Sequence, residues 1–399
     1  VKVTFVGNIT DVDDKILERS SKNGESPLEL SKRMAEIYQT EMASCGCLPP
    51  THEPKVSETI PEIVELVQKL IANESAYVLD MGGGKKDVYF SVRSFPGYGK
   101  LSRRKIDDLQ AGARVERDDH KRDPLDFALW KGAGANDWAW DSPWGRGRPG
   151  WHIECSAMAE KHLHHGFDVH GGGMDLIFPH HENEIAQSEA AEPGKGDYAR
   201  CWMHNGFVNV DKEKMSKSLG NFVTVRDVLA RNDAEGFRWF LLAAHYRGPI
   251  QFDTEQLGDR VIFPGVDEAE RRVDYLFATF ERLGELMRSA AAAPAKLAPE
   301  LKSFKTQLEA ATKQGEAALD DDLNTPVALA ALGEMTRIGN EVAMLAQKRK
   351  KDAAFVGSAG VFASDVRDAI KGLTQQLGLL NVTPQVYAAR VKERRLALR

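Results

Sequence analysis

The pattern of the chain changes at about residue 226, and this change constrains the fold more than any other feature. Residues 150–225 alternate helix-like and strand-like segments separated by glycines, a pattern typical of βα units on a parallel sheet. After residue 226 almost every segment has the periodicity of a helix. The sequence therefore predicts an α/β fold: a parallel-sheet domain that carries a large insertion, followed by an α-helical bundle.

Local patterns predict the individual elements. A strand is expected at 1–6, and the start of a helix at 13–19. Signals are mixed between 21 and 148, with a loop rich in Trp, Gly and Pro at 130–149. Further helices are expected at 31–42, 60–72, 225–232, 234–244, 267–290, 299–319, 325–347 and 364–377, and further strands at 76–79 and 88–91.

Composition narrows the class of protein. Charged residues make up 28% and hydrophobic residues 42% of the 399 residues, as in soluble globular proteins. No apolar run approaches the roughly 18 residues of a membrane span, so we expect no membrane. Four cysteines do not make a disulfide scaffold, and a reducing cytoplasm is expected.

Charge is uneven along the chain. The net charge of −6 argues against bulk attraction to nucleic acid. Residues 341–399, however, hold 11 Lys and Arg against 5 Asp and Glu. This tail is a candidate phosphate-facing surface, and a solvated amphipathic helix is the alternative.

Three residues offer the ligand set of a zinc site. His180 and Glu184 are four residues apart, and Pro179 favours the first turn of a helix, so the two side chains are expected on one helix face. Cys155 would come from elsewhere in space, and thiolate, imidazole and carboxylate together suit zinc. A surface ion pair is the commoner reason for a His-x-x-x-Glu spacing. Cys45-Gly46-Cys47 is interpreted as a turn with plain loop cysteines.

Two further segments suggest a nucleotide site. Three glycines follow His170 and would let the backbone approach a ligand closely, while Asp175 offers an acceptor to ribose hydroxyls. The loop 214–218 carries Lys214 and Lys217, and Lys217 is the candidate to meet negative charge on leaving pyrophosphate. A tight turn explains the glycines equally well, and an exposed basic turn is the alternative for the loop. A nucleotide beside a zinc ion that binds a thiol would suit the activation of cysteine as an adenylate.

Four stretches together resemble the cysteinyl-tRNA synthetases, a family of class I aminoacyl-tRNA synthetases. They are Asn8-Ile9-Thr10-Asp11-Val12-Asp13-Asp14-Lys15-Ile16, the run from Gly147 to Met158, the run from Phe167 to Ser188, and Lys214 to Asn221. The resemblance covers nearly the whole chain and implies a Rossmann-like catalytic domain. It also implies that cysteine and ATP, with Mg²⁺, form cysteinyl-adenylate before the cysteinyl group moves to the tRNA for cysteine.

The resemblance assigns roles residue by residue. Cys155, His180 and Glu184 match three of the four zinc ligands of the family, and the zinc would bind the substrate thiol in preference to the hydroxyl of serine. Thr10 and Trp151 match residues that line the cysteine pocket, and His170 and Asp175 match the nucleotide side. Lys217 matches the ATP-contacting lysine of the signature loop, in which Lys214 is a further catalytic candidate. The run from Asp320 to Pro326 resembles a signature of the helical tRNA-binding domain.

The resemblance also predicts domain limits and departures. The expected parts are a remnant of the first half of the nucleotide-binding domain (1–20), a connective insertion (21–148), the second half with the signature loop (149–225), a helical junction (226–265) and an incomplete helical anticodon-binding domain (266–399). The fourth zinc ligand and the histidines that bind ATP phosphates are expected upstream of Val1, and Gly7 stands where the family commonly has arginine. We therefore expect a fragment trimmed at both ends that is inactive in adenylate formation by itself.

Two other functions stay open. The cysteine ligase of mycothiol synthesis resembles this family and makes the same adenylate, but it passes cysteine to an amino sugar. A non-catalytic paralogue that binds RNA is the alternative from another class. The Asn183–Ser188 run and the long helical tail favour the synthetase.

Overall fold

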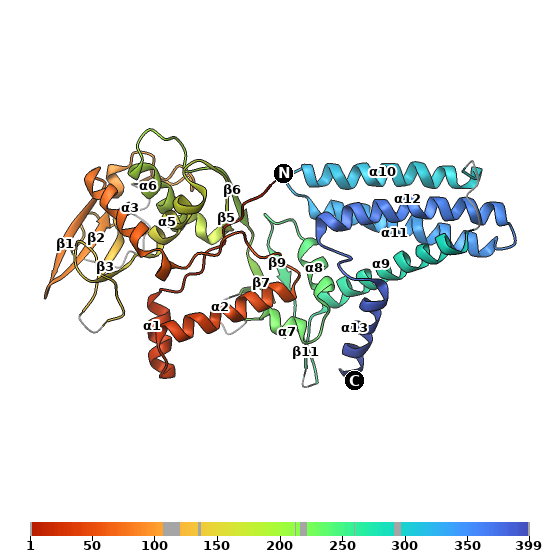
Figure 1. Ribbon diagram of the computed structural model, residues 1–399, viewed down its shortest axis with the longest axis horizontal. Helices are drawn as coiled ribbons and strands as arrows, with labels where there is room; N and C mark the ends of the chain where they lie inside the picture. The colour runs from red at the N-terminus through yellow and green to blue at the C-terminus, as the bar shows by residue number, and fades with distance from the viewer. Residues whose placement is uncertain are drawn as a thin grey trace. The chain divides into compact units, whose positions relative to one another are not determined.

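The computed structural model describes residues 2–106, 120–134, 137–211, 213–215, 222–258, 260–290 and 297–397 (Figure 1). It divides into two compact units, residues 1–40 with 48–205, and residues 41–47 with 206–399. Within the described residues, no helix combines the length and the apolar character needed to cross a membrane.

The first unit contains helices, an antiparallel sheet and a parallel strand pair. Its elements in chain order are α1 (Asp14–Asn23), α2 (Pro27–Ser44, whose last residues belong to the second unit), α3 (Ile60–Ala72), β1 (Ala76–Gly82), β2 (Lys85–Phe90), β3 (Phe127–Gly132), β4 (Gly147–Pro149), α5 (Trp151–Leu163), β5 (Phe167–Gly173), α6 (Glu182–Ala191) and β6 (Ala199–Asn205). Short helical turns occur at Val56–Glu58, Val92–Ser94, Met174–Leu176 and Ile177–His181.

The antiparallel sheet has the order β1-β2-β3-β4 and packs against α3. Val88 and Trp130 pair across β2 and β3, and both are fully buried. The apolar positions of α3 recur at Ile63, Val67 and Leu70, which lie three or four residues apart on one face. These side chains share one core with the sheet, so the pattern of α3 explains why it covers this sheet.

The parallel pair β5–β6 positions the functional residues. His170 of β5 is in register with Trp202 of β6, and the connection between the strands contains α6. A helix between two parallel strands is the βα arrangement that the glycine-broken pattern predicts. α5 and α6 pack against each other and against α3, which places their side chains in a common interior.

The second unit holds short strands and a large helical bundle. Its elements are β7 (Val208–Val210), β8 (Glu213–Lys214), α7 (Val225–Leu229), α8 (Ala234–Leu242), β9 (Ile250–Phe252), β10 (Glu255–Leu257), β11 (Arg260–Ile262), α9 (Pro264–Ser289), a short helical turn (Pro299–Leu301), α10 (Lys302–Asp320), α11 (Thr325–Lys348), α12 (Ala353–Leu377) and α13 (Pro384–Ala397). β7 pairs with β9 in parallel and with β8 in antiparallel fashion.

The bundle core is apolar and its helices start at polar caps. The Asn324 side chain accepts from the Val327 N–H at the start of α11, and Asp352 accepts from Phe355 N at the start of α12. Leu332 and Phe362, at the centres of these helices, are fully buried. The bundle therefore follows from amphipathic helices with ordinary caps.

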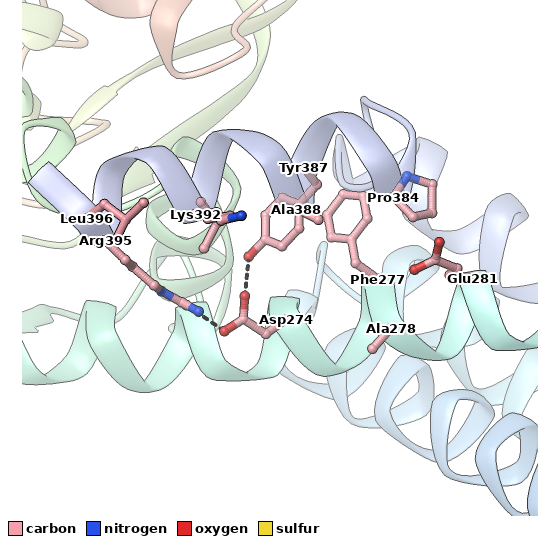
Figure 2. Close-up of a pocket in the computed structure, with 11 residues that line it drawn as sticks. Asp274, Phe277, Ala278, Glu281, Pro384, Tyr387, Ala388, Lys392, Arg395 and Leu396 are labelled. Atoms are coloured by element: carbon pink, nitrogen blue, oxygen red, sulfur yellow. Dashed lines mark hydrogen bonds and ion pairs between the residues drawn. The ribbon is translucent and has the colours of Figure 1, made fainter.

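α13 packs on α9, as Figure 2 shows. The rings of Phe277 and Tyr387 stack with centroids 3.9 Å apart, and the Tyr387 hydroxyl donates to Asp274. Arg395 also contacts Asp274 and closes one end of a groove of about 520 Å³ between the two helices. None of the predicted site residues lines this groove.

Several expected elements differ in the structure. Residues 2–5 form no strand, and only Val6 and Ile9 make isolated bridges to His52 and Lys55. β4 and the end of β3 lie inside the expected loop 130–149, and α12 begins at Ala353, well before the expected 364. The strands β9, β10 and β11 and the helix α13 were not expected. Strands of three residues are too short to show a period, and exposed charges mask the apolar positions of α13.

Candidate functional site

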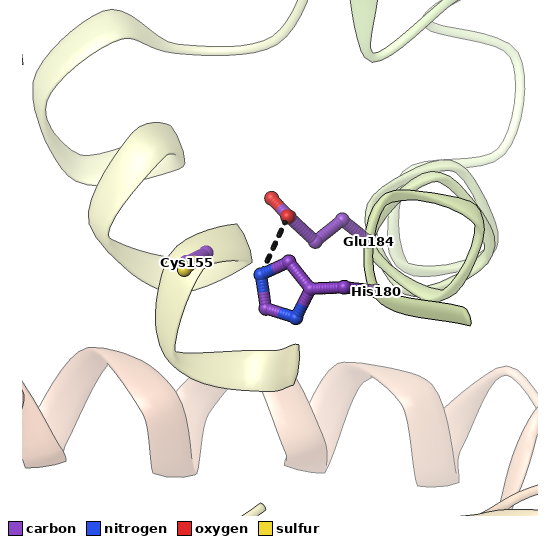
Figure 3. Close-up of side chains that lie close together, drawn as sticks. All are labelled: Cys155, His180 and Glu184. Carbon is purple, nitrogen blue, oxygen red and sulfur yellow. Dashed lines mark ion pairs between the residues drawn. The ribbon is translucent and has the colours of Figure 1, made fainter. Parts of the chain in front are cut away.

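α5, the helical turn Ile177–His181 and α6 bring Cys155, His180 and Glu184 together (Figure 3). Their ligand atoms all lie within 4.8 Å of one another. His180 Nε2 is 3.1 Å from Glu184 Oε1, one helical turn away. The sequence placed Pro179 in the first turn of a helix. Phe178 has extended backbone angles, and the helical turn that contains Pro179 and His180 continues directly into α6 at Glu182. His180 and Glu184 therefore face each other, as expected.

The three side chains form a donor set that fits a divalent metal ion. Glu184 is fully buried, and its Oε1 atom makes no hydrogen bond within the described part of the chain, although His180 Nε2 lies 3.1 Å away. Burial raises the pKa of the Cys155 thiol well above its ordinary value, and the carboxylates of Glu184 and Glu154 add to the effect. A cation between thiol and carboxylate would favour the thiolate and satisfy the carboxylate oxygen, so the residues present suit a metal.

Imidazole and indole rings fix the orientation of His180. His180 Nδ1 is 2.9 Å from His152 Nδ1, so one of the two nitrogens carries the proton between them. Burial lowers the pKa of His152 to about 3, which keeps its ring neutral at neutral pH and able to accept. The Trp151 ring lies 4.4 Å from the His180 ring, at 30°. His180 Nε2 is thereby left to face Glu184, which is how partners behind a metal ligand orient it.

A second group of histidines surrounds the other oxygen of Glu184. His170 Nε2 lies 3.5 Å from Glu184 Oε2, and the Tyr198 hydroxyl donates to the same oxygen at 3.2 Å. His170, His181 and Glu184 also place their ligand atoms within 4.8 Å of one another. Burial would raise the pKa of Glu184, but His170 and His180 hold it below its ordinary value. The sequence assigned His170 to the nucleotide side, and the structure places its ring beside a predicted metal ligand.

Other residues of this site escaped the sequence analysis. His181 Nδ1 is 2.8 Å from His204 Nε2, and burial lowers the pKa of His181 to about 3. The sequence signal was present for His181, which directly follows His180, and for His152, which lies in the run from Gly147 to Met158, but nothing in the sequence relates His204 to them. Their proximity arises from β6 and α5 and depends on the tertiary structure.

Two of the three glycines after His170 have close neighbours. A Cβ atom on Gly172 would lie 2.8 Å from Cε1 of His181, and one on Gly173 would lie 2.5 Å from Asp175 Oδ1. Real Cβ atoms do not approach other atoms so closely. The two glycines thus make room for His181 and for Asp175, whose side chain is exposed.

Thr10 is connected to the site through Asn8. The Asn8 side-chain amide contacts Thr10 Oγ1 at 3.3 Å and Cys155 Sγ at 3.6 Å. Asn8 was missing from the predicted site, although it begins the stretch that contains Thr10.

The signature loop belongs to the second unit. Lys214 ends β8, and its Nζ lies 4.0 Å from the centroid of the Phe207 ring. Lys217 lies outside the described residues.

Two family descriptions match the chain. One, for the tRNA synthetases class I (C) catalytic domain, matches residues 1–261, and the other, for the DALR domain, matches residues 316–381. A cysteine–tRNA ligase of Anaeromyxobacter dehalogenans is 47% identical over 402 residues, which cover 100% of this chain and 77% of the relative. The chain belongs to the cysteine–tRNA ligase family. The resemblance stated from the motifs is confirmed.

Other comparisons agree with membership of the cysteine–tRNA ligase family. A cysteine–tRNA ligase of Geobacter metallireducens is 43% identical and covers 99% of this chain and 76% of the relative. Among solved structures, a methionyl-tRNA synthetase of Mycobacterium tuberculosis in complex with methionyl-adenylate has a TM-score of 0.69 at 15% identity, covering 94% of this chain and 84% of that one. This likeness shows the fold alone. It confirms the predicted class, a Rossmann-like α/β region followed by an α-helical region.

Proposed function

We propose that this protein ligates L-cysteine to the tRNA for cysteine, with ATP, through a cysteinyl-adenylate. The convergence of Cys155, His180 and Glu184 in a member of the cysteine–tRNA ligase family carries the proposal. The same family membership supports a cytoplasmic enzyme, and the domain limits expected from the sequence belong to this proposal.

In this function Cys155, His180 and Glu184 hold zinc, and the cysteine pocket adds Thr10 and Trp151. Bound zinc supplies a Lewis acid that prefers the thiolate of cysteine to the hydroxyl of serine. Glu184 Oε1, which is buried without a hydrogen bond and lies 3.1 Å from His180 Nε2, supports this ligand role. Asn8, between Thr10 and the Cys155 sulfur, helps to orient that sulfur. Since a methylene-sized difference in a pocket is worth only about 1–3 kcal/mol, a metal–thiolate bond is the stronger means of selection.

Lys217 and Lys214 act on ATP, which binds with Mg²⁺. The cysteine carboxylate displaces pyrophosphate from the α-phosphate of ATP, and the lysines stabilise the negative charge on that leaving group. Asp175 accepts from the ribose, and His170 orients Glu184 besides lining the nucleotide side. The cysteinyl group then passes to the 3′ end of the tRNA, and AMP leaves.

The match to a DALR domain at residues 316–381 supports tRNA, in preference to an amino sugar, as the acceptor of cysteine. Its start overlaps the run Asp320–Pro326, which forms the turn into α11. If cysteine passed to an amino sugar and not to tRNA, the mycothiol-type ligase would be the correct assignment. If no adenylate formed at all, the correct assignment would be a non-catalytic RNA-binding protein.

The test is cysteine-dependent exchange of pyrophosphate into ATP, together with metal analysis, in the natural protein that contains this chain. Cys155→Ala should lose zinc and cysteine-dependent exchange. Cys201→Ala is the matched control, because Cys201 is exposed in the same unit and belongs to neither ligand group. Equal zinc content in Cys155→Ala and the unmodified protein would refute the ligand assignment. Lys217→Ala should slow exchange at saturating ATP with little change in cysteine binding.

A further inference from the structure

A loop in the first unit is fixed by a buried carboxylate that the proposed function does not use. Glu182, at the start of α6, is fully buried. Its oxygens accept from the backbone N–H groups of Gly99 at 2.9 Å, Leu101 at 3.4 Å and Ser102 at 2.7 Å. The next residue of α6, Asn183, accepts from the Tyr98 hydroxyl at 2.5 Å.

The backbone of this loop has little freedom. Gly99 has φ of +96°, and a Cβ atom there would lie 2.0 Å from the carbonyl oxygen of Arg104. Arg103 has φ of 56°, in the left-handed region that side chains rarely adopt. Such a conformation persists where surrounding contacts determine it, and it is enriched at binding sites. Glu182 supplies those contacts through the residue just before Arg103.

This fixed loop presents three consecutive cations, Arg103, Arg104 and Lys105, which we call the basic turn. All three are exposed, and none is ion-paired with a carboxylate among residues 2–106 and 120–211. Their neighbours differ, because Lys100 binds Glu189 and Asp197, and Arg93 binds Asp123. The Arg104 guanidinium lies 4.7 Å from the centre of the Phe178 ring, two residues before the proposed ligand His180. The basic turn is thus anchored to the segment that carries His180 and Glu184.

A run of cations that only faces solvent does not need a buried carboxylate to fix its backbone. Burying a carboxylate without a cationic partner is unfavourable, and here it fixes only backbone N–H groups. Fixing the backbone lowers the entropy lost when the cations bind a ligand. Guanidinium groups are suited to phosphate, which they bind through two parallel hydrogen bonds. The arrangement fits a phosphate ligand that approaches from solvent.

We propose that the basic turn binds backbone phosphates of the tRNA whose 3′ end is charged at the Cys155–His180–Glu184 site. This inference rests on the proposed function and adds residues to it. Exposed Arg and Lys are the usual partners of nucleic acid phosphates, whereas nucleotide triphosphates are more often held by backbone N–H groups and glycine-rich loops. tRNA is therefore favoured over ATP as the source of the phosphate.

The test uses the natural protein with Arg103→Ala, Arg104→Ala and Lys105→Ala combined. Binding of the tRNA for cysteine should weaken at least about tenfold, and the slope of log affinity against log salt should become shallower by about 2–3 if each cation contacts one phosphate. Pyrophosphate exchange without tRNA should stay within about twofold, because no part of the proposed adenylate site is changed. The control is Lys85→Ala with Lys86→Ala, two exposed lysines of the same unit that should leave the slope nearly unchanged.

A second variant separates charge from position. Glu182→Gln keeps the three cations but weakens their anchor, so it should weaken tRNA binding while the salt slope stays steep. Unchanged tRNA affinity and slope in the triple variant would overturn the proposal, and so would slowed exchange with unchanged tRNA affinity, which would assign the cations to ATP. If the unmodified protein shows no cysteine-dependent exchange, the proposed function fails, and the binding measurement still decides whether the basic turn contacts tRNA.

Discussion

α6 and α11 are both strongly buried helices, but they bury different kinds of side chain. Five of the buried residues of α6 are polar: Glu182, Asn183, Glu184, Gln187 and Ser188. Of the twelve buried residues of α11, only Thr336 and Asn340 are polar. α11 thus gains stability from burial of apolar surface, whereas α6 must compensate each buried polar group with a specific partner.

The partners of α6 show what its polar residues do. Asn183 accepts from Tyr98, Glu182 fixes a backbone loop, and Gln187 accepts from Ser156 at 2.7 Å. Within α6, Glu184 Oε1 makes no hydrogen bond to the described residues, although His180 Nε2 lies 3.1 Å away, and Gln187 Nε2 also lacks a hydrogen-bond partner there. Polar burial in α6 therefore builds the candidate site and its support, whereas apolar burial in α11 stabilises the bundle.

The largest effect is expected at Glu184. Glu184→Gln keeps the shape of the side chain but removes its charge, so zinc content should fall from about one ion per chain to near zero, and cysteine-dependent exchange should fall at least about 100-fold. Metal analysis and pyrophosphate exchange measure the two effects. Glu189→Gln, on the same helix but bound to Lys100, is the control and should retain zinc. An unchanged zinc content in Glu184→Gln would contradict the role given to the buried polar residues of α6.

Leu332→Ala should affect stability and not zinc. Leu332 is fully buried in the bundle, and truncation there leaves a cavity that costs about 2–5 kcal/mol of unfolding free energy. Met344→Ala, on the same helix at 54% exposure, should cost less than about 0.5 kcal/mol. Urea denaturation followed by circular dichroism gives both values. Loss of zinc in Leu332→Ala would contradict the separate roles of the two helices.

Gly172→Ala tests the packing behind the site. The added methyl group would collide with His181, so we expect a loss of about 1–3 kcal/mol in unfolding free energy and slower exchange. Gly171→Ala is matched to it, because the nearest atom to its Cβ would be 3.7 Å away. Thermal unfolding compares the stabilities of the two variants. Equal stability would show that the His181 ring moves aside at no cost in free energy.

Tyr387→Phe should have a smaller effect in the second unit. It removes the hydrogen bond to Asp274, worth about 0.5–1.5 kcal/mol, and keeps the stack on Phe277. Chemical denaturation is the measurement. Tyr275→Phe, at a residue that is 50% exposed, serves as the reference for loss of a hydroxyl. Identical values for the two variants would show that the Asp274 contact adds nothing.

The smallest effect is a pH dependence at Asp322. Hydrogen bonds from Arg247 and Tyr246 lower the pKa of Asp322 to about 2 from the usual 3.8. A lowered carboxyl pKa stabilises the fold above the unfolded value, and this contribution is lost as the pH falls from about 4 to 2. Asp322→Asn should flatten the stability profile slightly in that window, because exposed pairs contribute little. An identical acid profile in both proteins would exclude a role for this pair.

Patterns close in sequence were enough to predict much of the molecule. The helix expected at 60–72 is observed with those bounds, because its apolar spacing and Pro61 are local signals. Cys155, His180 and Glu184 could be named from motifs, and the family was confirmed by comparison. Lys217, Asp175 and the other site assignments stay predictions.

The rest was decided by contacts between residues far apart in the chain. The antiparallel sheet joins segments on both sides of residues 91–126. His152 of α5 contacts His180, and His204 of β6 contacts His181, both in the helical turn Ile177–His181. The sequence determined which residue types were available and which segments form helices, because propensity and periodicity act over a few residues. Only the tertiary structure placed an imidazole ring beside each carboxylate oxygen of Glu184, and the buried carboxylate of Glu182 against the backbone that leads into the basic turn. Such pairings depend on the packing of whole elements.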